Sequence, residues 1–80
     1  MTEKTINVGV DLDARKAAFF VQTANKFISR VEIMVGGKRI NAKSIMGTMA
    51  LGIQSGQQAT IITEGSDEEQ AATELVSVLV

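Results

Sequence analysis

Hydrophobic and polar residues alternate in two stretches of this chain, which is the period of strands with one buried face, and two later stretches also have the character of strands. In the first stretch, Ile6, Val8 and Val10 share one face, and polar or small residues occupy the other. Between the second and third stretches, Gly36 and Gly37 form a turn sequence that suits positive φ and therefore predicts a hairpin. We expect strands over about residues 3–9, 31–35, 38–41 and 59–63.

Other stretches carry apolar residues at every third or fourth position, which is the spacing of one helix face. The first such helix is expected over residues 14–27. Either Asp11 or Asp13, just before it, is placed to cap its N-terminus. Its apolar positions are Ala17, Val21, Ala24 and Ile28.

Two further helices are expected after the hairpin. The first lies within residues 43–52, with Ser44 as its N-cap and Gly52 as its C-terminal stop. The second opens with Ser66 and Glu69, which have the spacing of a capping box. Its apolar stripe consists of Ala71, Leu75, Val78 and Leu79.

The predicted order is therefore strand, helix, strand, strand, helix, strand, helix. Two of the helices are long enough to cover a sheet face, so an α+β two-layer sandwich buries every apolar face. We expect an open-faced sandwich in which a four-stranded antiparallel sheet carries the helices on one face. A single domain spans residues 1–80, because a chain of this size supports one core. The pattern leaves a ferredoxin-like order of the strands open.

Composition and charge narrow the functional classes. Hydrophobic residues make up 45% of the chain and charged residues 21%, as in an ordinary soluble domain. The net charge of −1 argues against direct binding of nucleic acid or of an anionic membrane. No apolar run approaches the roughly 20 residues that span a bilayer. The N-terminus also begins with a polar stretch, so we expect a cytoplasmic protein.

The chain contains neither cysteine nor histidine. A disulfide or thiolate metal site is therefore impossible, and zinc would have only carboxylates to bind. The missing histidine also removes the most common general base and any phosphohistidine. Gly47 and Gly52 lie too far apart for a phosphate-binding loop. We find no catalytic constellation, and we expect a protein that is not an enzyme and uses no cofactor or metal.

Two stretches are similar to the two signature regions of the HPr phosphocarrier family, at the separation that this family uses. Residues 13–18, Asp-Ala-Arg-Lys-Ala-Ala, resemble the family's active-site stretch His-Ala-Arg-Pro-Ala at the start of the first helix. Residues 41–47, Asn-Ala-Lys-Ser-Ile-Met-Gly, resemble the stretch with the serine that HPr kinase/phosphorylase modifies. The resemblance covers nearly the whole chain and implies an HPr-like fold.

The resemblance implies that Ser44 is a regulatory phosphorylation site. At the other signature, Asp13 stands in place of the family's phosphoryl-accepting histidine, and Lys16 stands in place of proline. One branch of the family, the catabolite-repression HPr or Crh, also lacks the histidine and keeps the serine, although it has glutamine where this chain has Asp13. The implied function is a regulator of carbon catabolite repression that, once phosphorylated, binds a LacI-type catabolite control protein as corepressor. The implied partner-binding residues are Arg15, Ala18, Gln22, Ile45, Met46 and Met49.

Some of these residues also have a simpler structural explanation. A serine at a helix start is often only an N-cap, worth about 1 kcal/mol. Capping and phosphorylation of Ser44 are compatible, because a phosphate there faces free backbone N–H groups. Apolar residues at helical spacing are usually core residues. The pattern thus predicts that at least one of Ile45, Met46 and Met49 is buried, together with Leu51. The resemblance implies instead that these three residues are at least partly exposed and contact partners.

Asp13 leaves further alternatives open. Its carboxylate is most cheaply explained as a helix cap, with Arg15 as a solvated charge that pairs with it weakly. As an alternative, Asp13 accepts a phosphoryl group from a phosphoenolpyruvate-dependent enzyme I, and Arg15 holds the anion. A third hypothesis is an HPr-fold module that binds another protein through the same surface without being phosphorylated.

Overall fold

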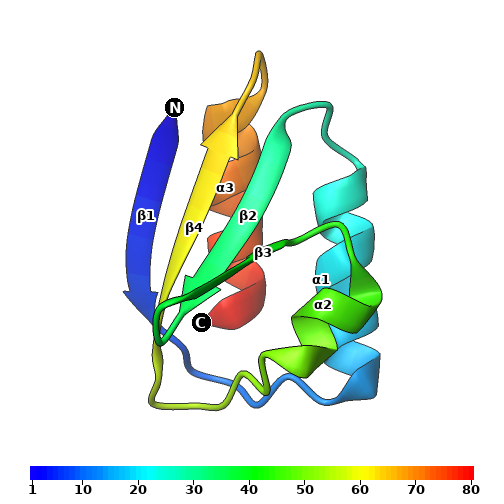
Figure 1. The fold of residues 1–80 in the computed structure, drawn as a ribbon. Helices are drawn as coiled ribbons and strands as arrows, with labels where there is room; N and C mark the ends of the chain where they lie inside the picture. Colours follow the sequence, from blue (N-terminus) through cyan, green and yellow to red (C-terminus); the bar gives the residue numbers. More distant parts are fainter.

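Four strands form one sheet, and the helices lie against one of its faces (Figure 1). The computed structural model describes all of residues 1–80. The strands are β1 (Thr2–Asn7), β2 (Arg30–Val35), β3 (Lys38–Asn41) and β4 (Gln58–Glu64). The helices are α1 (Ala14–Asn25), α2 (Ile45–Ala50) and α3 (Glu68–Leu79). The element order and the open-faced α+β sandwich are as predicted.

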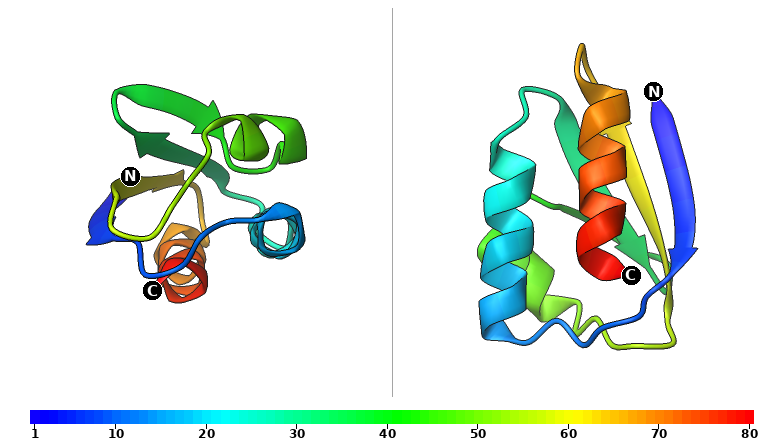
Figure 2. Two further views of the ribbon diagram at one scale, coloured as in Figure 1. Left: turned by 90° about the horizontal axis from the view of Figure 1, so that it is seen from below. Right: turned by 180° about the vertical axis from the view of Figure 1, so that it is seen from behind.

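The sheet has the strand order β1-β4-β2-β3, and every neighbouring pair is antiparallel. The first strand therefore lies at an edge, which excludes the ferredoxin-like order with its central first strand. Helices α1 and α3 run side by side behind the sheet, and α2 contacts both α1 and β3 (Figure 2). The opposite face of the sheet carries no helix.

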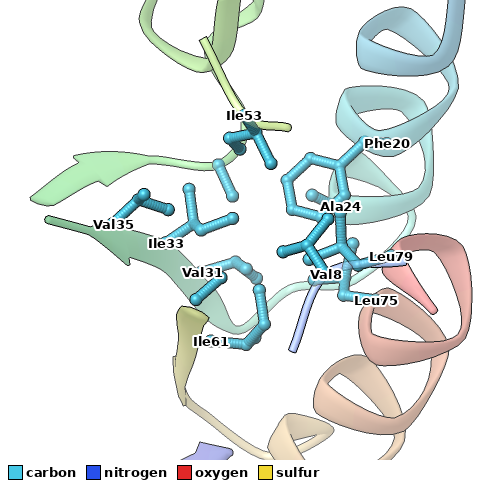
Figure 3. Packing of buried hydrophobic residues seen from close by; sticks show 12 residues of the cluster. Val8, Phe20, Ala24, Val31, Ile33, Val35, Ile53, Ile61, Leu75 and Leu79 are labelled. Carbon is cyan, nitrogen blue, oxygen red and sulfur yellow. The ribbon is translucent and has the colours of Figure 1, made fainter. Parts of the chain in front are cut away.

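The core lies between the two central strands and the two long helices. Ile33 of β2 lies opposite Ile61 of β4, and both are fully buried. Phe20 of α1 and Leu75 and Leu79 of α3 meet this pair from the helical layer (Figure 3). Burying one such side chain contributes about 1.5–3 kcal/mol, so these contacts hold the two layers together.

Two predicted boundaries differ from the structure. β1 ends at Asn7, because the ladder with β4 breaks at Val8: its N–H still donates to the Gln57 carbonyl at 2.8 Å, but its carbonyl accepts from Gly56 and not from Gln57. α1 ends at Asn25, and its last backbone bonds tighten to the i−3 carbonyl. Ile28, predicted to lie on the apolar face of this helix, is in the following loop and is 80% exposed. Both elements thus end where their regular hydrogen-bond pattern changes.

The capping box predicted from Ser66 and Glu69 is wrong. The N-cap of α3 is Asp67, whose side chain makes no capping hydrogen bond. Its carboxylate instead accepts hydrogen bonds from the Ser29 hydroxyl and from the backbone N–H groups of Ile28 and Ser29, the last two at 3.0 Å. These bonds, with that from the Ser29 hydroxyl first, lower the pKa of Asp67. The side chain therefore ties the α1–β2 loop to the start of α3.

One buried hydroxyl has no partner. Thr48 of α2 is 1% exposed, and its Oγ1 makes no hydrogen bond. Because an unsatisfied buried hydroxyl is costly, Thr48→Val is expected to stabilise the protein by about 1 kcal/mol. This gain corresponds to a rise in Tm of about 4–8 °C for a domain of this size. Thermal unfolding followed by circular dichroism measures it.

Thr63 provides the matched control for this substitution. It is also fully buried, but its hydroxyl donates to the backbone carbonyl of Glu68 at 2.9 Å. Thr63→Val is therefore expected to lower Tm, because it removes this hydrogen bond and leaves the Glu68 carbonyl without the donor. Equal shifts in the two variants would contradict this account of Thr48.

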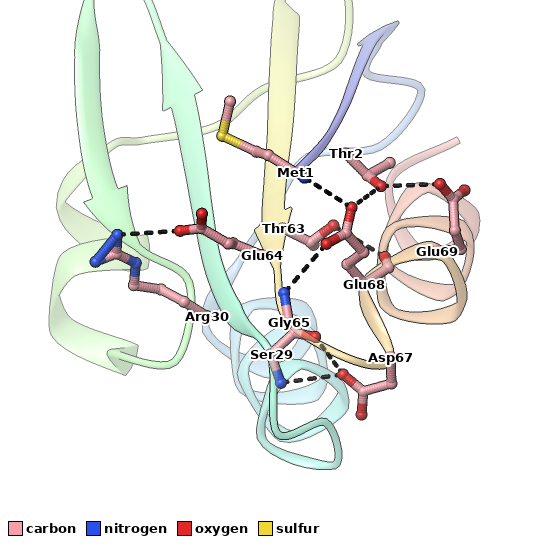
Figure 4. A network of polar contacts seen from close by, with 10 residues as sticks. All are labelled: Met1, Thr2, Ser29, Arg30, Thr63, Glu64, Gly65, Asp67, Glu68 and Glu69. Atoms are coloured by element: carbon pink, nitrogen blue, oxygen red, sulfur yellow. Dashed lines mark hydrogen bonds and ion pairs between the residues drawn. The ribbon is translucent and has the colours of Figure 1, made fainter.

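Glu68 joins β1 to α3 through a network of polar contacts (Figure 4). Its carboxylate accepts hydrogen bonds from the Thr2 hydroxyl at 2.6 Å and from the N–H of Gly65 at 3.2 Å. The N-terminal amino group of Met1 lies 3.1 Å away. These partners, Thr2 foremost, lower the pKa of Glu68 to about 2.

The lowered pKa of Glu68 predicts an acid-sensitive contribution to stability. Because the folded state favours the charged carboxylate, this contribution is full above the ordinary pKa of 4.5 and is lost as the pH falls toward 2. We expect Glu68→Gln to be less stable than the parent at pH 7, with the difference closing in that window. Urea unfolding at a series of pH values measures the difference. A difference that does not depend on pH would contradict the assignment.

Candidate functional site

Ser44 is the N-cap of α2, as predicted. Its hydroxyl oxygen accepts a hydrogen bond from the backbone N–H of Gly47 at 3.1 Å, and its backbone is extended, with φ −100° and ψ 118°. The residue is exposed. The helix ends at the C-cap Leu51, and Gly52 follows with φ +60°, as predicted for the stop. Ser44 therefore presents a hydroxyl at the surface, with one neutral partner.

The apolar residues of α2 point largely away from the core. Ile45 is 38% exposed, Met46 81% and Met49 48%, so the prediction that at least one of them is buried is wrong. Leu51 is half-buried and packs against the core. The inward position of this short helix is filled by Thr48, which leaves the larger side chains at the surface.

Asp13 caps α1, which confirms one of the two predicted capping residues. Its Oδ1 accepts a hydrogen bond from the backbone N–H of Lys16 at 2.9 Å. Asp11 does not cap the helix. Its Oδ1 accepts a hydrogen bond from the backbone N–H of Ser55, in the α2–β4 loop, at 2.8 Å. The Asp13 residue is exposed, so capping does not hide its carboxylate from another protein.

The predicted partner-binding residues of α1 lie on one side of that helix. Arg15 and Gln22 are exposed, and Ala18 is half-buried. Phe19, four residues after Arg15, shares this side and is 58% exposed. Sequence reasoning missed Phe19, although the helical spacing was a signal: Phe20 lies three residues after Ala17 and shares its buried face, whereas Phe19, two residues after Ala17, does not. α1 and α2 are in contact, so the two sets of surface residues lie on neighbouring helices.

No three acidic side chains come together in an arrangement that would hold a metal ion, and the surface has no pocket. None of the helices has the length and apolar character that crossing a bilayer requires.

Comparison with known proteins identifies the family. A family model for the PTS HPr component phosphorylation site matches residues 2–80. The chain belongs to the HPr family. The HPr-like protein Crh of Halalkalibacterium halodurans is 49% identical over 81 residues, which cover 99% of this chain and 96% of that protein. Two solved structures, one of an HPr and one of a Crh, agree with this assignment.

The first is the phosphocarrier protein HPr of Bacillus anthracis str. Ames, with a TM-score of 0.95 and 46% identity over 99% of this chain and 96% of that one. The second is Crh, the catabolite repression protein of Bacillus subtilis, crystallised as a domain-swapped dimer. It has a TM-score of 0.78 and 44% identity over 91% of this chain and 84% of that one. The predicted HPr resemblance and fold are thus confirmed, and this HPr-family protein is related to catabolite-repression proteins. The roles of Ser44, Asp13 and the partner-binding residues stay predictions.

Proposed function

We propose that this HPr-family protein is a Crh-like regulatory module that is phosphorylated on Ser44 by HPr kinase/phosphorylase. The phosphorylated form binds a LacI-type catabolite control protein as corepressor. The module acts in the cytoplasm, where the kinase finds ATP, and it catalyses no reaction of its own. It does not carry phosphoryl groups on histidine, because the chain has none.

The observation that carries this proposal is the common exposure of Ser44 and its apolar neighbours on α2. Ile45, Met46 and Met49 leave apolar surface beside the hydroxyl, and such surface is typical of a protein-binding site. Phosphorylation adds a charge of about −1.5 to −2 and three acceptor oxygens next to this surface. A partner with an apolar pocket flanked by arginine or lysine would thus bind the phosphorylated form more tightly.

The phosphorylation step transfers the terminal phosphoryl group of ATP. The Ser44 Oγ attacks the γ-phosphorus, and its proton passes to a base of the kinase. The new Oγ–P bond forms as the bond from the γ-phosphorus to the β,γ-bridging oxygen breaks, and ADP leaves. This chain supplies an accessible hydroxyl, and the kinase supplies the catalytic groups.

The test is incubation of the protein with HPr kinase/phosphorylase and ATP, followed by mass spectrometry of its peptides. We expect one phosphate, located on Ser44. Ser44→Asn is the sharper negative variant than Ser44→Ala, because asparagine caps a helix as well as serine does but has no hydroxyl. Both variants are expected to remain unlabelled, and Ser55→Ala, which alters another exposed serine, is expected to be labelled like the parent.

Partner binding is measured next with the phosphorylated and the unmodified protein. We expect the LacI-type protein to bind the phosphorylated form at least tenfold more tightly, a coupling of about 1.4 kcal/mol. Met46→Ser is expected to weaken this binding without loss of stability, because Met46 is 81% exposed. Equal affinity for the two forms would contradict the proposed switch.

The Asp13 alternative is decided by a parallel incubation with enzyme I and labelled phosphoenolpyruvate. We expect no label. Formation of an aspartyl phosphate usually requires a bound metal ion, and no other acidic side chains gather with Asp13 into a group that could hold one. A base-labile label that is lost in Asp13→Asn would instead favour the phosphocarrier. Absence of label in both incubations, with active enzymes, would favour a module that is not phosphorylated.

A further inference from the structure

The segment that precedes Ser44 is fastened to the end of α1. The Lys43 ammonium nitrogen donates to the backbone carbonyl of Phe27 at 2.8 Å. The side-chain amide of Asn25 donates to the backbone carbonyl of Lys43 at 3.4 Å. The Asn41 side chain accepts from the N–H of Lys43 at 2.8 Å. We refer to these three bonds as the Lys43 clamp.

The environment of the Lys43 ammonium favours this arrangement. The Phe27 carbonyl lies just beyond the C-terminus of α1, where the helix dipole attracts a cation. α1 has no basic residue in its own last turn, and the C-cap Lys26 pairs with Glu74 at 3.1 Å, so it is Lys43 that donates to the Phe27 carbonyl at this end. Lys43 is half-buried, whereas Lys38 in the hairpin is exposed. A lysine held in this way contributes a fixed contact and not only a surface charge.

The clamp acts on the backbone from which Ser44 projects. Ser44 must keep its extended backbone for its hydroxyl to accept from the N–H of Gly47. Fixing the preceding residue on both its side chain and its carbonyl restricts the rotations that would move the Ser44 Oγ. Phosphoryl transfer needs this oxygen in line with the γ-phosphorus, and a displacement of about 1 Å can cost a hundredfold in rate.

We infer that Lys43 is a positioning residue that holds Ser44 in the conformation from which it is phosphorylated. This inference rests on the function proposed above. It assigns to the segment that follows α1 a part in the modification of Ser44, because the acceptor of the Lys43 ammonium, the Phe27 carbonyl, lies two residues after the end of that helix.

Kinetics with HPr kinase/phosphorylase and ATP test the inference on the whole protein. Lys43→Met keeps the apolar stem without the ammonium, and it is expected to lower kcat/KM by roughly ten- to a hundredfold. Lys43→Arg should restore most of the loss, because a guanidinium group can also donate to the carbonyl. Asn25→Ala should cause a smaller loss, since it removes only the longest bond of the clamp, together with the bond from the same amide to the Val21 carbonyl at 2.9 Å within α1. Lys38→Met removes the same charge elsewhere and should leave the kinetics unchanged.

Amide hydrogen exchange provides a measurement that does not involve the kinase. In Lys43→Met, the Gly47 amide is expected to exchange about fivefold faster, as for loss of one ordinary hydrogen bond. The amides of Ile33 and Ile61 in the central strands should keep their parent rates, which separates a local effect from general destabilisation.

The possible outcomes distinguish the two claims. If the parent protein takes no phosphate from an active kinase, the proposed function fails and the inference fails with it. If the parent is phosphorylated and Lys43→Met reacts at the same rate, only the inference is overturned. Slow phosphorylation of Lys43→Met with unchanged exchange at Gly47 would indicate direct contact between Lys43 and the kinase, which also overturns it.

Discussion

Gly65→Ala is expected to destabilise the protein by about 3 kcal/mol or more, because the substitution adds both overpacking and backbone strain. Gly65 has φ +152°, a value that residues with a side chain rarely adopt. A Cβ at this position would lie 2.5 Å from the Ser29 Oγ and 2.7 Å from the Ser29 Cα. Ser29 cannot move aside easily, because it is 1% exposed and bonded to Asp67. Urea unfolding at pH 7 measures the loss.

Gly36→Ala is the matched control for this prediction. Gly36 also has positive φ, at +57°, but a Cβ there would meet nothing within 4 Å. Gly36→Ala is therefore expected to lower the free energy of unfolding by only about 1 kcal/mol, the strain of a left-handed backbone in a residue with a Cβ. If the two variants lost the same stability, the close approach of Gly65 to Ser29 would not be the cause.

The contrast between these glycines shows which parts of the fold the sequence reveals. The Gly36–Gly37 hairpin was predicted correctly, because a turn of this type depends on a few adjacent residues. The close contact of Gly65 with Ser29, and the use of Asp67 by the α1–β2 loop, depend on residues far apart in the chain. The capping-box prediction for α3 failed for this reason, since local spacing does not show which distant N–H groups compete for a carboxylate.

In the candidate site, too, features set by adjacent residues were predicted, and features set by distant contacts were not. The N-caps Ser44 and Asp13 were predicted from their positions before apolar runs, and the structure confirms both. Burial within α2 was not predicted correctly, because six helical residues are too few to establish which side faces the core. Here Thr48 takes the inward position, and the larger apolar residues remain outside. The contact between Lys43 and Phe27 could not be predicted, since it depends on how the helices pack.

The second large effect is expected from Phe20, whose neighbour Phe19 serves as its control. Phe20 is fully buried against the central strands, so Phe20→Ala removes a large core side chain and leaves a cavity. Such substitutions cost about 3–5 kcal/mol. The total stability of a domain of this size is of similar magnitude, at roughly 0.05–0.15 kcal/mol per residue. We therefore expect Phe20→Ala to be largely unfolded or to melt near room temperature, as measured by circular dichroism.

Phe19→Ala removes the same side chain from the adjacent position with the opposite environment. Because Phe19 is 58% exposed, its loss is expected to change stability by no more than about 0.5 kcal/mol. If the function proposed above holds, the variant should remain a substrate of the kinase, since Ser44 and the Lys43 clamp are intact. Its affinity for the catabolite control protein should nevertheless fall by about fivefold or more, as for an aromatic contact worth at least 1 kcal/mol at an interface. A folded, phosphorylated Phe19→Ala that binds with full affinity would exclude this ring from the partner-binding surface and confine that surface to α2 and the remaining residues of α1.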